Sequence, residues 1–173
     1  FHPYDNGGTA FDRDNWWPAS SIKIFAAVSA LQVVRAKGFS PRATATFQYE
    51  ERPRTLPVSK IVELALTPSN NRAFDRLVEI AGFDRINGRF FTPRNGFRGT
   101  VFLRSYARRV LNPETKLGTP RHSPAIELKE KKKTATLPER NGKGQFKCPY
   151  QGNCTTPWEL AETMRRVMMH EHL

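Results

Sequence analysis

The segment from Ile24 to Val34 constrains the fold most, because it reads as a helix that is apolar on almost all sides. Ile24, Ala27, Val28, Leu31 and Val34 follow the spacing of a helical face. Such a helix is stable only when other elements cover it, so we expect it to be buried. Lys37-Gly38 supplies the stop signal after it.

The rest of the chain reads as a mixture of helices and short strands, which predicts an α+β fold in one domain spanning residues 1–173. Helices are predicted at 58–66, 72–81 and 158–170, with Thr156 as the N-cap of the last. Residues 44–49 read as a short strand and 125–137 as an extended or hairpin excursion. The turn signal Asp5-Asn6-Gly7-Gly8 predicts a strand, a turn and a second strand near the N-terminus.

The chain carries a net charge of +12, which favours anionic partners such as nucleic acid, an anionic membrane face or an acidic polymer. The positive residues are spread out apart from the stretch around Lys131-Lys132-Lys133, and no zinc-finger or RNA-binding signature is present. We therefore interpret the charge as a basic solvated surface and expect no nucleic-acid partner. No run approaches 18 apolar residues, so no membrane span is predicted.

Cys148 and Cys154 are the two cysteines, separated by a short, turn-rich loop. Five intervening residues do not fit a redox C-x-x-C motif, and the spacing of His170 and His172 does not complete a metal site. We expect a small structural disulfide, which implies an oxidising compartment, with two free thiols in a reduced cytosol as the alternative. No metal or other cofactor is expected.

Ser20-Ser21-Ile22-Lys23 forms an S-x-x-K motif at the mouth of the apolar helix. A serine hydroxyl is a weak nucleophile and needs a base beside it. Residues three apart share a helical face, so the Lys23 amine can reach the Ser20 hydroxyl, and a dry pocket lowers a lysine pKa. Four residues alone are weak evidence, because the pattern also arises by chance.

Ser69-Asn70-Asn71 is the second polar cluster, between two predicted helices. Serine and asparagine are ordinary helix caps, which is the simpler interpretation. The functional interpretation is an S-x-N loop, in which a hydroxyl relays a proton to a leaving group and an amide orients lysine and substrate.

Three segments together resemble the class A β-lactamases and penicillin-binding proteins. Residues 18–24 look like the nucleophile segment, and 58–80 look like the S-D-N helix pair with Asn70 in place of the usual Asp. Thr155-Thr156-Pro157 resembles the helix start that follows the family's omega loop. The order and spacing of these segments are also similar to the family's.

This resemblance implies an active-site-serine hydrolase of the β-lactamase/transpeptidase-like fold, mainly its helical part with an N-terminal strand remnant. Ser20 would form an acyl-enzyme, Lys23 would act as base and Ser69 would pass a proton to the departing nitrogen. Asn71, with its neighbour Asn70, would bind the substrate. The resemblance also implies a β-lactam or peptidoglycan-peptide substrate, a periplasmic or secreted location and a monomer.

Two features of the family are missing. No K-T-G or K-S-G follows the last predicted helix, and Lys133-Thr134-Ala135 precedes it and lacks the glycine. We therefore expect a fragment that ends before the C-terminal sheet strands, and the start without Met fits a mature or truncated form. No glutamate between 112 and 153 has the omega-loop pattern, although Glu114 and Glu139 lie in the interval.

Alternatives stay open. Without a deacylation base the chain would behave like a D-alanyl-D-alanine carboxypeptidase or penicillin-binding protein, and an esterase on the same fold is a third possibility. A non-catalytic homologue that docks to anionic cell-wall polymer would keep the fold without the chemistry.

Overall fold

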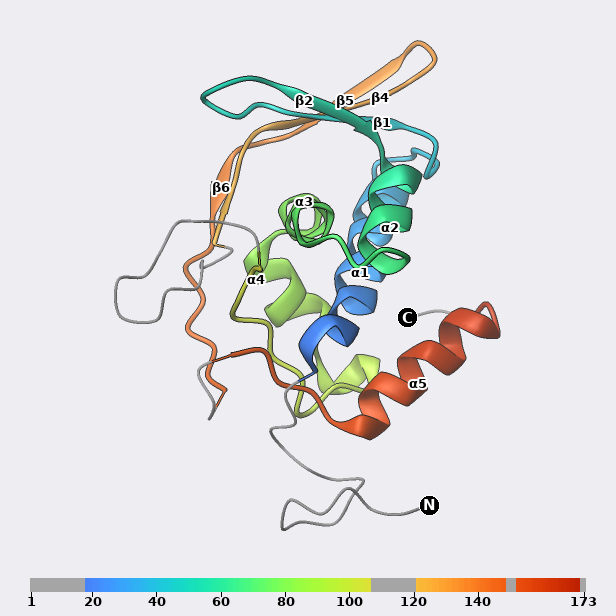
Figure 1. Cartoon of the computed structure of the whole chain (residues 1–173), viewed down its shortest axis with the longest axis vertical. Helices are drawn as coiled ribbons and strands as arrows, with labels where there is room; N and C mark the ends of the chain where they lie inside the picture. Colours follow the sequence, from blue (N-terminus) through green and yellow to red (C-terminus); the bar gives the residue numbers. More distant parts are fainter. Residues whose placement is uncertain (1–17, 107–120, 149–151, 172–173) are drawn as a thin grey trace.

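The computed structural model describes residues 18–106, 121–148 and 152–171. Helix α1 (Lys23–Ala36) runs through the centre and is preceded by a short 3-10 turn, η1 (Ala19–Ile22). Its buried residues include Phe25, Ala30 and Val34, and it packs against α2 and α3 (Figure 1). The prediction of a buried central helix is confirmed.

Helices α2 (Val58–Leu66) and α3 (Asn71–Ala81) pack against each other and against α1. The bounds of α2 agree with the prediction, and α3 begins one residue earlier than predicted. Asn70 caps α3, since its side chain accepts a hydrogen bond from the N–H of Ala73 at 2.9 Å. Gly82 ends the helix at a φ of 85°, a conformation that glycine adopts without steric cost.

A four-stranded antiparallel sheet lies across one end of the helices (Figure 1). Its order is β2-β1-β4-β5, formed by β1 (Thr44–Phe47), β2 (Arg54–Pro57), β4 (Ile126–Glu130) and β5 (Lys133–Leu137). Phe47 faces Ile126 in register, Ile126 faces Leu137, and all three are buried. The predicted strand near 44–49 and the predicted hairpin at 125–137 are therefore confirmed.

The predicted N-terminal strands lie in residues 1–17, outside the described structure, and all four strands of the sheet come from later segments. The sequence did not predict β2, which contains Pro57 and follows Pro53. Proline cannot donate to a sheet ladder, but it is tolerated on an edge strand such as β2.

A series of short elements follows α3. It consists of α4 (Phe83–Arg85), the π-helical turn η2 (Ile86–Phe90) and the 3-10 turn η3 (Pro93–Asn95). A two-stranded ladder pairs β3 (His122–Ser123) with β6 (Arg140–Asn141). Cys148 and Cys154 are joined in a disulfide with Cα atoms 6.0 Å apart, and Cys154 also pairs with Val101 in an isolated β-bridge.

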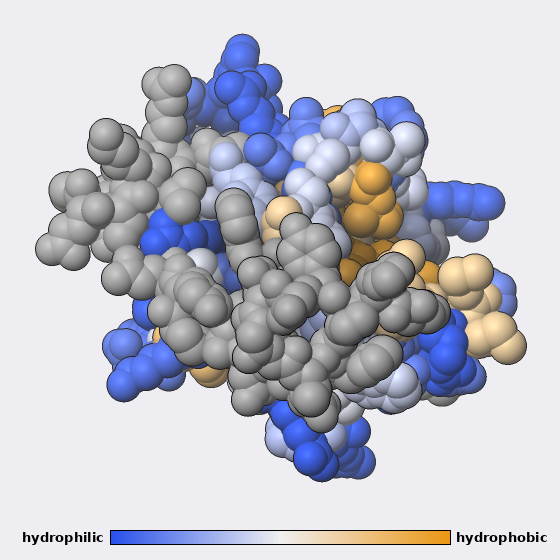
Figure 2. Space-filling view, turned by 60° about the horizontal axis from the view of Figure 1, so that its bottom comes forward, coloured by the Kyte–Doolittle hydropathy of each residue, from blue (hydrophilic) through white to orange (hydrophobic). Residues whose placement is uncertain are grey.

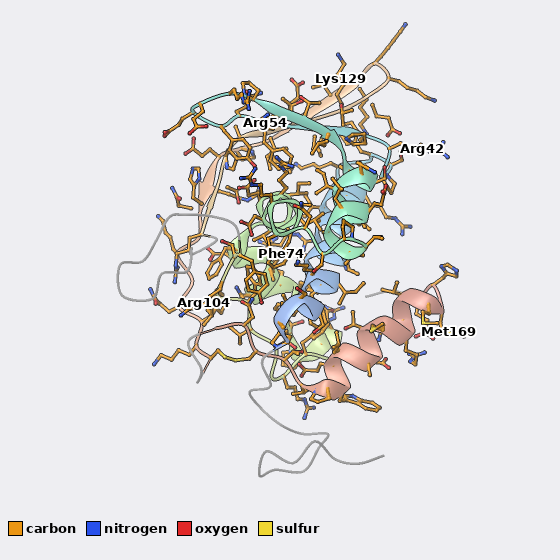
Figure 3. The ribbon with its side chains drawn as sticks, viewed as in Figure 1. Arg42, Arg54, Phe74, Arg104, Lys129 and Met169 are labelled. Atoms are coloured by element: carbon orange, nitrogen blue, oxygen red, sulfur yellow. A yellow bond between two sulfur atoms is a disulfide. The ribbon has the colours of Figure 1, made fainter. Side chains whose placement is uncertain are left out.

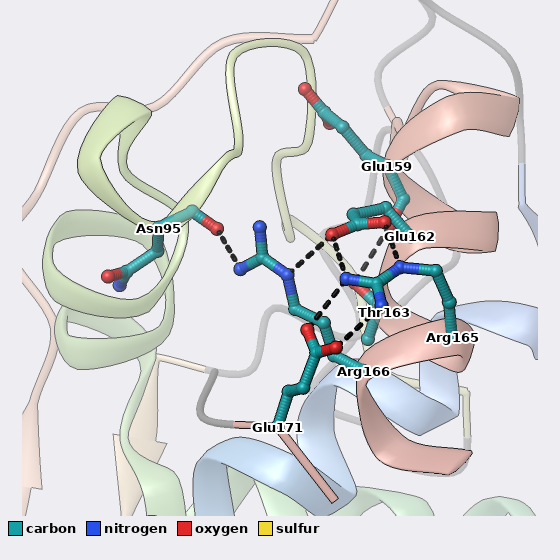
Figure 4. Close-up of polar contacts among 7 residues, drawn as sticks. All are labelled: Asn95, Glu159, Glu162, Thr163, Arg165, Arg166 and Glu171. Carbon is teal, nitrogen blue, oxygen red and sulfur yellow. Dashed lines mark hydrogen bonds and ion pairs between the residues drawn. The ribbon is translucent and has the colours of Figure 1, made fainter. Parts of the chain in front are cut away.

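Helix α5 (Pro157–Met168) begins where the N-cap signal predicts, because Thr156 accepts a hydrogen bond from the N–H of Glu159. It ends two residues before the predicted position. Arg166 ties the helix to the body of the chain by donating to the carbonyl of Asn95 at 3.1 Å, and it also pairs with Glu162 (Figure 4). The buried Glu159 accepts from the N–H groups of Arg98 and Gly99 and from the Thr100 hydroxyl.

Apolar and polar surfaces are unevenly distributed. Among the residues that Figure 2 colours by hydropathy, the hydrophobic ones gather toward one side and most of the others are hydrophilic. The exposed large hydrophobic residues lie mainly on and after α5, namely Trp158, Met164, Val167, Met168 and Met169. Within the described residues, one helical stretch, Ala19–Ala36, is long and apolar enough to cross a membrane, but half of it is buried in this core, so it is weak evidence for a span.

Candidate active site

Lys23 is the best-defined residue of the candidate site. It is the first residue of α1, and only 1% of its surface is exposed. Its Nζ lies 2.8 Å from the Oγ of Ser69, 2.5 Å from the Ser69 carbonyl oxygen and 2.8 Å from the Oδ1 of Asn71. The structure therefore brings together Lys23 of the first motif with Ser69 and Asn71 of the second.

Burial lowers the pKa of Lys23 from its ordinary value of 10.5, because the charged form loses hydration. The negative charge of Asp75 acts in the opposite direction and raises this pKa. Desolvation is the larger effect, so the Lys23 amine loses its proton at a lower pH than a lysine in water does. A neutral amine has a lone pair that can accept a proton from a hydroxyl such as that of Ser69.

Aromatic rings complete the surroundings of the amine. Its Nζ lies 5.9 Å from the ring centroid of Phe74 and 6.0 Å from that of Tyr106. The two rings stack with centroids 5.3 Å apart, and Phe74 lies in the interior between the helices (Figure 3). Rings at this distance attract the ammonium form weakly and exclude water from one side of it.

Ser20 lies in η1, three residues before Lys23, with an exposed side chain. Its carbonyl accepts the backbone N–H of Lys23. In the described part of the chain its hydroxyl makes no hydrogen bond to Lys23, whose three short contacts all go to the Ser69–Asn71 segment. The adjacent hydroxyl of Ser21 is turned away, donating to the carbonyl of Pro18.

Two residues of the site hold an unusual backbone conformation. Ala19 has a φ of 45° and Ser69 a φ of 56°, in the left-handed region that costs a non-glycine residue free energy. Ala19 is directly before Ser20, and its carbonyl accepts a hydrogen bond from the hydroxyl of Tyr106 at 3.0 Å. Backbone strain of this kind is concentrated at functional sites.

Asn70 was predicted to bind substrate together with Asn71, but the structure separates their contacts. The Asn71 amide faces Lys23, whereas the Asn70 side chain caps α3. A substrate-binding role of Asn70 therefore stays a prediction, and the contact in the structure is the capping one.

Three residues near the site were not found from the sequence, namely Asp75, Tyr106 and Asn153. Asp75 is 6% exposed and accepts the N–H of Tyr106 at 3.2 Å. Asn153 is 1% exposed and donates to the hydroxyl of Tyr106 at 3.1 Å, while its Oδ1 accepts the N–H groups of Leu103 and Arg104. The position of Asp75, four residues after Asn71 on a helix, is the one signal that could have indicated it.

Of the two acidic residues considered as deacylation bases, Glu139 is the one that the structure describes. Glu114 lies outside the described residues. Glu139 is exposed and pairs with His122 at 2.9 Å. No described group of three or more His, Cys, Asp or Glu residues could hold a metal ion.

Lys133-Thr134-Ala135, which resembles the third family motif superficially, lies on β5. Lys133 donates to the carbonyl of Gly38, just past the C-terminal end of α1. Lys23 is at the other end of this 14-residue helix, about 21 Å away along its axis. The segment therefore does not belong to the candidate active site.

Comparison with known proteins gives one match. Neither the curated proteins nor the solved structures contain a match to this chain. A family model described as the β-lactamase enzyme family matches residues 6–173, which is nearly the whole sequence. The match covers both motifs of the site and the start of α5. The chain therefore belongs to the β-lactamase enzyme family.

Proposed function

We propose that the protein is a serine hydrolase that forms an acyl-enzyme on Ser20 and hydrolyses the amide bond of a β-lactam. The observation that carries the proposal is the buried Lys23 amine, three residues after an exposed serine and in contact with Ser69 and Asn71. Membership of the β-lactamase enzyme family points to hydrolase activity of the same kind.

The first step of this mechanism is acylation. The neutral Lys23 amine, directly or through a water molecule, takes the proton of Ser20 as its oxygen attacks the substrate carbonyl. Ser69, in contact with the same amine, passes a proton to the departing nitrogen as the amide bond breaks. The Asn71 amide orients the lysine and the substrate. The N–H of Ser20 contributes half of the oxyanion hole, and losing one such donor typically costs about 3 kcal/mol.

The second step, deacylation, separates two candidate functions. Glu139, the described one of the two glutamates considered as deacylation bases, is engaged at the surface, and the buried Glu159 already accepts from two backbone N–H groups and a hydroxyl. Neither is free to activate water at Ser20. This favours, as the second candidate, a D-alanyl-D-alanine peptidase or penicillin-binding protein in which the β-lactam adduct persists.

The test combines nitrocefin turnover with intact-mass analysis and fluorescent-penicillin labelling of the longest natural form of the chain. Fast turnover supports the lactamase, and a stable adduct on Ser20 supports the peptidase. Ser20→Ala should abolish both signals, whereas Ser21→Ala should leave them unchanged, since the Ser21 hydroxyl points to Pro18. Labelling that survives in Ser20→Ala would overturn the proposal.

No labelling at all by either penicillin or a fluorophosphonate would support the non-catalytic, cell-wall-binding alternative. Labelling by the fluorophosphonate alone, with hydrolysis of simple esters, would support an esterase. We further propose that the chain forms one catalytic domain of the β-lactamase/transpeptidase-like fold and works in the periplasm or outside the cell. The Cys148–Cys154 disulfide supports an oxidising compartment.

A further inference from the structure

A cavity lies well away from the candidate active site, at the other end of α3. It has a volume of about 260 Å³ and four arginines in its wall, Arg85, Arg89, Arg121 and Arg140. The active-site residue Asn71 begins α3 and Ala81 ends it, so about 16 Å of helix separates the two regions. The cavity therefore belongs to a different part of the molecule.

Two of the arginines in the cavity wall are held by hydrogen bonds to backbone carbonyls. Arg140 donates to the carbonyls of Glu79 and Ile80, both at 2.7 Å, which satisfies the C-terminal end of α3. Arg121 donates to the carbonyls of Gly142 and Gly144 and lies 4.8 Å from the ring centroid of Phe83. These contacts give both guanidinium groups a structural role.

The other two arginines have no such role. Neither the Arg85 nor the Arg89 side chain makes a hydrogen bond or ion pair within the described structure. The one carboxylate in the cavity wall, that of Asp84, already accepts the N–H groups of Lys143 and Gly144, each at 3.0 Å. The wall therefore holds four positive charges against one negative charge.

This arrangement is electrostatically unfavourable when the cavity holds only water. The pKa of Arg85 is lowered by burial and by the charge of Arg89, and the pKa of Arg140 is lowered by burial and by the charge of Arg85. Arg85 and Arg140 are only partly exposed, and like charges with reduced hydration destabilise one another unless an anion lies between them. An anion bound between Arg85 and Arg89 would reverse this cost.

We infer that the cavity is a binding site for the dianionic phosphate group of a phosphate monoester. A guanidinium fork matches two phosphate oxygens at once, and the two unoccupied forks of Arg85 and Arg89 match the two charges of the group. The volume is below the roughly 300 Å³ at which pockets for drug-sized ligands begin, as expected for a small charged group.

The organic part of the ester has a place beside this group. Another cavity, of about 750 Å³, shares Arg121 and Asn141 with the arginine-lined cavity, so the two cavities adjoin at these residues. Its wall combines the acidic Glu50, Glu51 and Glu139 with the basic Arg52 and Arg54. Mixed charge of this kind suits a polar, hydrogen-bonding group rather than an apolar one.

The test is isothermal titration calorimetry on the full chain at constant ionic strength, with inorganic phosphate, glycerol phosphate and dimethyl phosphate as probes. We expect saturable binding of phosphate and of the monoester, and at least tenfold weaker binding of the singly charged diester. Arg85→Gln and Arg89→Gln should each weaken monoester binding at least tenfold. Arg94→Gln removes an exposed charge outside the cavity and should bind like the wild type.

Three results would overturn the inference. One is a heat of phosphate addition no different from that of sodium chloride at matched ionic strength. Another is wild-type affinity in both Arg85→Gln and Arg89→Gln, with circular dichroism showing that they are folded. The third is equal affinity for diester and monoester, which would assign the surface to a phosphodiester polymer instead.

Discussion

The Nζ of Lys23 lies 2.8 Å from the Oγ of Ser69, although 46 positions separate the two residues in the sequence. This contact joins the start of α1 to the segment that precedes α3, and Asn71 adds a second contact across the same gap at 2.8 Å. Because both helices begin here, the positive ends of their dipoles also favour negative charge that develops on a substrate oxygen.

Replacing Lys23 by Arg should lower the acylation rate by about 10²- to 10⁴-fold, the range typical for loss of a general base, because a guanidinium stays protonated. Stopped-flow labelling with a fluorescent penicillin measures this rate. In the wild type the rate should rise with pH through the lowered pKa of Lys23 and then level off. Lys37→Arg, on an exposed residue at the far end of α1, serves as the control. A pH-independent wild-type rate would argue against Lys23 as the base.

Lys23 should also link stability to pH. Its pKa is lower in the folded state than its ordinary 10.5, so between these two values the unfolded chain binds more protons. The free energy of unfolding of the wild type should therefore rise with pH relative to that of Lys23→Met, and the difference should level off above 10.5. Urea titrations of both proteins at several pH values measure it. A difference that falls as the pH increases would contradict the pKa direction.

Asp75→Asn should lower the pKa of Lys23 further, because it removes the negative charge that stabilises the ammonium form. The acid limb of the acylation profile should then move to lower pH. The matched control is Glu63→Gln, which removes a carboxylate exposed on α2. If the acid limb lies at the same pH in Asp75→Asn and in the wild type, the charge of Asp75 does not affect the pKa of Lys23.

Asn153→Ala should reduce both stability and acylation. It would leave the partly buried N–H groups of Leu103 and Arg104 without this acceptor, at a cost of about 1–3 kcal/mol, and would remove the hydrogen bond that the Asn153 amide donates to the hydroxyl of Tyr106. Asn87→Ala is a matched control, because Asn87 is also buried and bridges Phe83 to Phe102. Thermal melts should shift for both variants, whereas acylation should slow for Asn153→Ala alone. If acylation slowed equally in Asn153→Ala and Asn87→Ala, the role of Asn153 would be purely structural.

Removing the disulfide by the double substitution Cys148→Ser and Cys154→Ser should cost about 2 kcal/mol, from the chain entropy of so short a loop. Urea unfolding of wild type and variant, with and without a reducing agent, checks this. The reducing agent should destabilise the wild type to the level of the variant and leave the variant unchanged.

The helices could be predicted because their signals are local. Apolar periodicity places α1, Thr156 starts α5, and Gly82 ends α3, each within a few residues of the element it marks. Strand β2 could not be predicted, since Pro57 within it and Pro53 before it argue against a strand until its place at the sheet edge is known.

In the candidate site, too, the residues marked by local sequence motifs could be predicted, and those placed by tertiary packing could not. Ser20, Lys23, Ser69 and Asn71 fall within two short motifs that a single sequence displays. Tyr106 and Asn153 reach the site only through packing of loops that are distant in sequence, so no local pattern marks them. The assignment of catalytic roles stays a prediction until the labelling experiments are done.

The left-handed conformation of Ala19 implies a trade-off between stability and activity. Glycine would adopt this φ of 45° without steric cost. A chain selected for thermal stability alone would therefore be expected to carry glycine at position 19. Alanine leaves the backbone fewer alternative conformations than glycine does. Thermostabilising substitutions in this protein should therefore be sought away from residue 19, because relaxing that turn would loosen the residue on which the chemistry is proposed to depend.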